Sequence, residues 1–207
     1  IFSKEYKRGF GVSFSDSFFI PLDGSLDDKP TALGSAGGDL YIFREKSIYV
    51  ISGDGPSRTG SGSYFTPRLV SNTIGALKGS PTIFTDSGLF FQTVKGIYRI
   101  GKSGIEYVGA GIEKTMGTDV LREIIEDQKT QTIRFLTSDK VFALNTTYNQ
   151  WSHWEYNQAS DTSFSGMCSI DNVVYMTTND NELWTEGEHS MQEDSAYLPL
   201  SLKTGWI

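Results

Sequence analysis

The feature that most constrains this chain is a pair of short apolar segments, joined by a tight turn, that occurs four times. The copies read LYIF-REK-SIYVI, LFFQ-TVK-GIYRI, IRFL-TSD-KVFAL and VYMT-TNDN-ELW, and they begin at Leu40, Leu89, Ile133 and Val174. An aromatic residue lies nine positions after the start of the first three copies, and ten after the start of the fourth, whose turn is one residue longer. Apolar runs of this length, separated by turn residues, predict β-hairpins.

Each hairpin belongs to a larger unit, because the starts of the copies differ by 49, 44 and 41 residues. This spacing is typical of a four-stranded propeller blade. A further strand is expected before each hairpin, and a fourth strand after at least two of them. The expected flanking strands are Thr31–Ser35, Pro81–Phe84, Val120–Ile125 and Gly166–Ile170, followed by Ile105–Val108 and Trp151–Tyr156.

A single meander leaves its faces exposed, and stacking around an axis covers them. We therefore predict an all-β fold, a β-propeller built of four-stranded antiparallel meander blades, with about four blades in this chain and more outside it. Residues 1–26 are expected to hold the end of a preceding blade and a connector. The expected blades are approximately 27–79, 80–118, 119–164 and 165–207.

Two points of the pattern stay open at this stage. The segment Ile112–Ile125 has apolar residues at near-helical spacing, but the repeat favours a strand after an irregular connector. The aromatic residues of the hairpins are expected to pack between blades, and a carbohydrate-binding platform is the alternative. They are Tyr41, Phe43, Tyr49, Phe90, Tyr98, Phe135, Phe142, Tyr175 and Trp184.

The charge balance disfavours a nucleic-acid-binding surface. The chain has 18 Lys and Arg against 25 Asp and Glu, a net charge of -7, whereas such surfaces are basic. An acidic wall could still line a passage for a polyanion. The single cysteine, Cys168, excludes an intramolecular disulfide and is expected to be buried and structural. No apolar run reaches the roughly 18 residues of a membrane helix, so we expect no membrane insertion by this segment.

No catalytic, cofactor or metal site is predicted. His153 and His189 have no partners at catalytic or zinc spacing, and the acids Asp23, Asp27, Asp28, Asp180 and Glu182 do not form a calcium loop. Asp86-Ser87-Gly88 partly matches the Asp-box turn and is interpreted as an ordinary hairpin turn. The Gly-rich loop Gly53–Ser63 lacks the Lys-Ser or Lys-Thr of a phosphate loop and is predicted to make a subunit contact. Its candidate residues are Gly53, Asp54, Gly55, Pro56 and Arg58.

Several phrases occur in an order that resembles the β-propeller region of tail nozzle or hub proteins of short-tailed bacteriophages. They are FSKEY, FSDSFFIPLD, DDKPTALGS, DLYIFREKSIYVISGDGP, GLFFQTVKGIYRI, YVGAGIE, YNQWSHW and TGWI, and together they cover nearly the whole chain. The resemblance implies a virion structural protein, assembled in the host cytoplasm and part of a longer polypeptide. It also implies a ring, usually hexameric, beneath the portal and adaptor, through which the genome leaves without specific binding.

Two readings from other classes remain open. A carbohydrate-binding module on the host surface would need exposed aromatics beside polar side chains. A glycosidase-type propeller would need two carboxylates about 5 to 9 Å apart in a cleft. The leading expectation is a non-enzymatic tail component with neither cofactor nor metal.

Overall fold

The computed structural model describes residues 20–22, 27–53, 66–155 and 163–186, together with two short strands, β16 (Gln192–Glu193) and β17 (Ala196–Tyr197). The chain divides into two compact units, Ile1–Lys78 and Gly79–Ile207. Strands dominate both units, and among the described residues helical structure is limited to two short segments near position 112. The predicted all-β, propeller-type array of antiparallel meander blades is confirmed.

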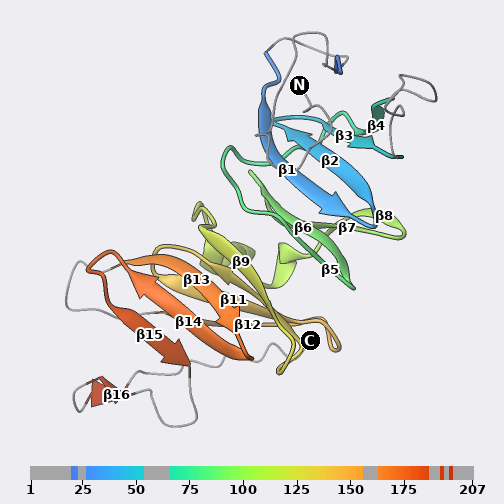
Figure 1. Ribbon diagram of the computed structural model, residues 1–207. Helices are drawn as coiled ribbons and strands as arrows, with labels where there is room; N and C mark the ends of the chain where they lie inside the picture. Colours follow the sequence, from blue (N-terminus) through green and yellow to red (C-terminus); the bar gives the residue numbers. More distant parts are fainter. Residues whose placement is uncertain are drawn as a thin grey trace, which may run out of the picture. The chain divides into compact units, whose positions relative to one another are not determined.

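The first unit contains one four-stranded sheet in the order β1-β2-β3-β4 (Figure 1). Its strands are β1 (Pro30–Ala36), β2 (Asp39–Arg44), β3 (Ile48–Ile51) and β4 (Arg68–Ser71). The turn between β1 and β2 needs positive φ angles, 60° at Gly37 and 88° at Gly38, which glycine adopts without steric cost. The fourth strand, β4, was not among those expected from the sequence.

The second unit begins with the sheet β5-β6-β7-β8. Its strands are β5 (Ile83–Thr85), β6 (Gly88–Thr93), β7 (Gly96–Gly101) and β8 (Gly104–Tyr107). The predicted ordinary hairpin turn at Asp86-Ser87 joins β5 to β6, and Thr85 accepts a hydrogen bond from the Ser87 N–H within it.

Two further sheets follow in the same unit, each an antiparallel meander (Figure 1). The first contains β9 (Glu123–Asp127), β10 (Thr132–Leu136), β11 (Lys140–Asn145) and β12 (Gln150–Glu155). The second contains β13 (Phe164–Ile170), β14 (Val173–Thr178) and β15 (Leu183–Glu186). All four predicted hairpins are therefore present, while the blade limits as such stay a prediction.

The segment that allowed a helix or a strand contains both. A 3-10 turn, η1 (Gly109–Gly111), and one helical turn, α1 (Glu113–Met116), form the connector, and β9 starts only at Glu123. The expected strand start at Val120 is therefore wrong by three residues. Leu121 still belongs to the core cluster, because the connector packs on the sheets it joins.

Within the second unit, consecutive sheets pack face to face. We call the face of β5–β8 that contains Phe90 and Ile97, and the equivalent face of each other sheet, the trailing face, and we call the opposite face the leading face. Phe90 and Ile97, on the trailing face of β5–β8, share an apolar cluster with the leading face of β9–β12, which provides Ile124, Ile133, Phe135, Phe142 and Leu144. The trailing face of β9–β12 provides Ile125, Leu136 and Val141 to a second cluster with Phe164, Met167 and Val174 of β13–β14.

The aromatic packing expected between blades is confirmed at Phe135. Its ring centroid lies 6.0 Å from that of Phe90 on the preceding sheet and 5.3 Å from that of Trp151 on its own sheet. Phe135 is completely buried. This side chain is therefore a direct contact between consecutive blades.

A substitution at Phe135 tests how much packing between blades contributes to stability. We expect Phe135→Ala to lower the free energy of unfolding by about 3 to 5 kcal/mol, because it leaves a cavity between two sheets. Tyr148→Ala, in the exposed turn after β11, should change it by less than about 0.5 kcal/mol. Urea unfolding followed by tryptophan fluorescence measures both, and equal effects would contradict the packing assignment.

Candidate functional site

Most of the predicted subunit-contact loop lies outside the described residues. Gly53 follows β3, is exposed and has a φ of 96°, a left-handed conformation that favours glycine. Asp54, Gly55, Pro56 and Arg58 lie in the segment 54–65, which the structure does not describe. The subunit-contact role of this loop stays a prediction.

The candidate acids and histidines have mainly structural surroundings where they are described. Asp28 is buried, and its carboxylate accepts hydrogen bonds from the Lys46 N–H at 2.9 Å and from the Ser47 hydroxyl. His153 is half-buried, with its ring 5.9 Å from that of Phe142. In the ranges that the structure describes, no three His, Cys, Asp or Glu side chains come together as a metal site. Asp23 and His189 lie outside those ranges.

The interpretation of Cys168 as a buried structural cysteine is wrong. Cys168 is exposed. It lies opposite Tyr175 in the β13–β14 ladder, on the trailing face of that sheet, whereas its neighbour Met167 points into the cluster shared with β9–β12. The alternation of side chains along a strand therefore places the cysteine on the uncovered side.

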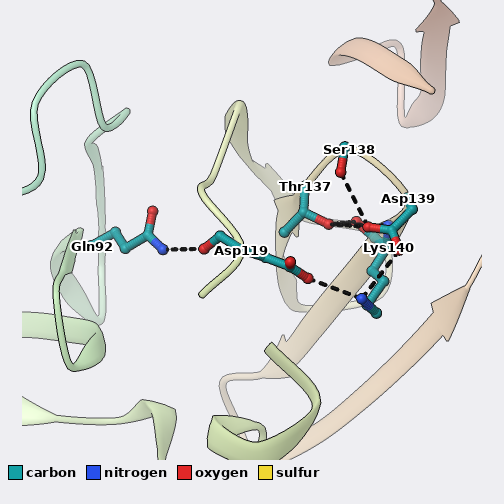
Figure 2. A network of polar contacts seen from close by, with 6 residues as sticks. All are labelled: Gln92, Asp119, Thr137, Ser138, Asp139 and Lys140. Carbon is teal, nitrogen blue, oxygen red and sulfur yellow. Dashed lines mark hydrogen bonds and ion pairs between the residues drawn. The ribbon is translucent and has the colours of Figure 1, made fainter. Parts of the chain in front are cut away.

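A polar network joins the sheets β5–β8 and β9–β12, and Figure 2 shows Asp119 between Gln92 and Lys140. Gln92 of β6 donates from Nε2 to the Asp119 carbonyl at 2.6 Å, and its Oε1 accepts from the Leu121 N–H at 2.8 Å. Lys140 of β11 holds the Asp119 carboxylate at 2.9 Å and that of Asp139 at 3.1 Å. The network thus holds the connector at Asp119 and Leu121 with side chains from the sheets on both sides of it.

The charges of this network stabilise one another. Burial by itself would lower the pKa of Lys140, but its hydrogen bonds to Asp119 and Asp139 and their charges outweigh burial and raise it. Burial alone would likewise raise the pKa of Asp139, yet Lys140, Ser138 and Thr137 hold it below its ordinary value. These side chains have a structural role, because their hydrogen bonds and ion pairs are made with one another and with the backbone.

Two more side chains connect consecutive sheets by single hydrogen bonds. The Trp151 indole of β12 donates to the carbonyl of Val108, after β8, at 2.8 Å. Arg122, just before β9, donates to the carbonyl of Phe164 at the start of β13. Both sheet-to-sheet junctions of the second unit are therefore fixed by directional bonds as well as by apolar packing.

A buried ion pair lies on the trailing face of β9–β12. Nη2 of Arg134 in β10 lies 2.6 Å from Oδ2 of Asp127 in β9, and only 5% and 4% of the two side chains are exposed. The Arg134 guanidinium also lies 5.5 Å from the centre of the Trp154 ring. Burial would raise the pKa of Asp127, but the Thr130 hydroxyl, the charge of Arg134 and the backbone N–H groups of Thr130 and Lys129 outweigh it and lower the pKa.

The bonds between sheets could not be predicted from the sequence, although the register of the hairpins could. The partners of Gln92 lie 27 and 29 positions away, and no local motif connects them with it. A signal in the sequence is the polar residue Gln92 at the end of the apolar strand LFFQ, where a buried amide needs hydrogen-bond partners.

In the described part of the chain no helix has the length and hydropathy needed to cross a bilayer.

Comparison with known proteins supports the fold alone. No protein-family model and no curated protein matches the sequence. Among solved structures, the extracellular domain of a hybrid two component system from B. thetaiotaomicron is similar, with a TM-score of 0.50, 16% identity, and coverage of 83% of this chain and 22% of that one. The extracellular domain of a one component system from the same organism gives a TM-score of 0.53, 16% identity, and coverage of 94% and 24%. The chain thus spans about a quarter of the length of these structures.

Removing both hydrogen bonds of the Gln92 side chain tests whether it holds the connector in place. Gln92→Ala should lower the free energy of unfolding by about 2 kcal/mol, because the Leu121 N–H and the Asp119 carbonyl lose their partner in a buried site. Hydrogen exchange at the Leu121 amide should accelerate in parallel. Gln128→Ala, at an exposed turn position, is the control. An unchanged exchange rate of the Leu121 amide in Gln92→Ala would contradict this role of Gln92.

The Asp127–Arg134 pair predicts an acid-sensitive contribution to stability. Because the folded-state pKa of Asp127 lies below its ordinary value of 3.8, this contribution is complete above that value and is lost as the pH falls through the folded-state pKa. Asp127→Asn should cost about 3 kcal/mol at neutral pH and should flatten the decline in stability below pH ~4. Urea unfolding from pH 7 to 2.5 measures this, with exposed Asp171→Asn as control. A decline as steep in Asp127→Asn as in the parent would refute the assignment.

Proposed function

We propose that this chain is the propeller region of a virion structural protein, a subunit of the tail nozzle or hub ring of a short-tailed bacteriophage. The ring forms the conduit through which the genome leaves. The proposal rests first on the ordered phrases of the sequence, from FSKEY to TGWI, that resemble this family. In this role the protein works through its shape and contacts rather than through a catalytic centre.

The structural observation that carries the proposal is the way consecutive blades are fixed to one another. In the second unit, apolar clusters join the sheets, and Gln92, Trp151 and Arg122 add hydrogen bonds across the junctions. The buried charges Asp127 and Arg134 are paired within a blade. Polar side chains that could form a ligand site are used here to hold blades in place, which suits a wall that must keep its shape under load.

The charge of the chain is compatible with a conduit for DNA. A net charge of -7 opposes phosphate binding, and each phosphate contact would add salt-dependent affinity and slow the passage of the duplex. The proposed partners are other copies of the chain, in a ring that is hexameric in the family it resembles, and the portal, adaptor and other tail proteins. The proposed location is the virion tail.

The carbohydrate-binding alternative receives less support from the packing. Phe90, Phe135 and Phe142 are completely buried between sheets, so these aromatic side chains are unavailable as a sugar platform.

The oligomeric state and DNA behaviour of the purified chain test the proposal together. Electron microscopy and mass photometry should show closed rings with a central hole wide enough for a DNA duplex. At about 0.15 M salt the rings should retain no linear duplex in a mobility-shift assay, since the acidic surface repels phosphate. Particles without a central channel, or a monomer that binds sugars on a glycan array, would overturn it.

A further inference from the structure

The sheet β13–β15 differs from the other three sheets in its number of strands. Each of the others continues into a fourth strand, which is β4, β8 or β12, whereas β13–β15 ends at its third strand within the residues that the structure describes (Figure 1). The outer strand, β15, has the sequence LWTE, and its large apolar and β-branched residues favour strand pairing. An edge strand of this kind is a template for another extended segment.

The position of Leu183 in β15 shows what its equivalents in the second unit contact. Ile97 of β7 and Val141 of β11 occupy the same place in their hairpins. The Ile97 carbonyl accepts a hydrogen bond from the N–H of Val108, just after β8, at 3.1 Å, and Val141 lies opposite Trp154 of β12. Both residues are completely buried, whereas Leu183 is 65% exposed. In both preceding sheets, therefore, the chain around the fourth strand lies beside this position.

The backbone of Leu183 is oriented towards the outer edge of its sheet. The Thr178 N–H donates to the Glu182 carbonyl at 3.1 Å, and the next pair along the β14–β15 ladder is Thr177 and Leu183. Hydrogen-bonded and non-hydrogen-bonded pairs alternate along an antiparallel ladder, so the N–H and C=O of Leu183 point away from β14. They face the side on which β8 and β12 lie in the two preceding sheets.

We propose that residues 199–202 of this chain pair with β15 and complete the sheet β13–β15 as its fourth strand. These residues lie outside the described ranges. In the other sheets the third strand is joined to the fourth by residues 52–67, 102–103 and 146–149. Residues 187–198 are a link of intermediate length, so the meander can continue within the same chain. The inference goes beyond the proposed function, since it concerns how this sheet is completed whatever the protein does.

The sequence of the segment selects one register. Leucine alternates with other residues in LPLSL, from Leu198 to Leu202, which is the pattern of a half-buried strand. Because proline has no N–H, Pro199 fits an edge strand only where its nitrogen points away from the sheet. The peptide groups of Leu200 and Leu202 then point towards β15, and their side chains lie on the same face as that of Leu183. The missing N–H and the apolar alternation thus agree on one arrangement.

Placing Leu202 opposite Leu183 pairs all four residues of β15 and leaves β17 paired with β16. The two Cα atoms are then about 5.5 Å apart, a separation that a disulfide can bridge. On mild oxidation, Leu183→Cys with Leu202→Cys, in a Cys168→Ser background, should form a disulfide within one chain, seen as a faster-migrating monomer on a non-reducing gel. Leu183→Cys with Lys203→Cys is the matched control and should stay reduced, because residue 203 points to the opposite face.

Hydrogen exchange at the Leu183 amide tests the register independently. Leu200→Pro removes an N–H that faces β15, whereas Ser201→Pro removes one that points away from it. Exchange at Leu183 should accelerate at least about fivefold in Leu200→Pro and stay unchanged in Ser201→Pro. The amides of β10 should remain protected in both variants, which shows that the blades still fold.

Two results would overturn the inference. The first is equal exchange at Leu183 in the two proline variants, with no disulfide in Leu183→Cys with Leu202→Cys. The second is a disulfide-linked dimer in place of the monomer, with protection at Leu183 that depends on protein concentration, since this would identify a second copy as the partner of β15. Neither result bears on the ring and DNA measurements, so the proposed function would still stand.

Discussion

The structure depends on one constraint: a meander whose strands are apolar on both sides must be covered on both sides. The sheet β9–β12 shows this most clearly, since adjacent residues of β10, Phe135 and Leu136, point to opposite faces and both are completely buried. Burying a large apolar side chain is worth about 1.5 to 3 kcal/mol relative to leaving it in water. A blade of this composition gains that energy only when it has a neighbour on each face.

The same constraint determines what happens to polar groups. A polar atom between two covered faces has lost water, so it needs a partner within the protein. Arg134 meets this need with Asp127 and the Trp154 ring, and Gln92 with the backbone of the next connector. Apolar packing alone is non-directional. The hydrogen bonds between blades are directional, so they determine the position and orientation of one blade on the next.

The hairpins could be predicted because their information is local. Alternating apolar residues and turn residues identify β2–β3, β6–β7, β10–β11 and β14–β15, and Asp171 and Asn172 adopt the positive φ angles of 51° and 61° that their turn position suggested. Burial could not be predicted in the same way, because it depends on which sheet lies opposite. Cys168 has the local setting of a core residue, yet it is exposed on a trailing face. Similarly, no local pattern connects Gln92 with Asp119, since their contact exists only once two blades are stacked.

The composition of the last trailing face adds a final step. Where β9–β12 has Leu136 and Ala143, the equivalent positions of β13–β15 are Thr177 and Thr185, while Leu183 keeps the apolar character of Val141. At these two positions the face is more polar than its counterpart, whereas the charged Arg134 of β9–β12 is replaced by Tyr175. Thr177 and Thr185 are exposed, and their hydroxyl groups can keep hydrogen bonds to water there, whereas the covered face of β9–β12 requires apolar residues or paired charges at its positions.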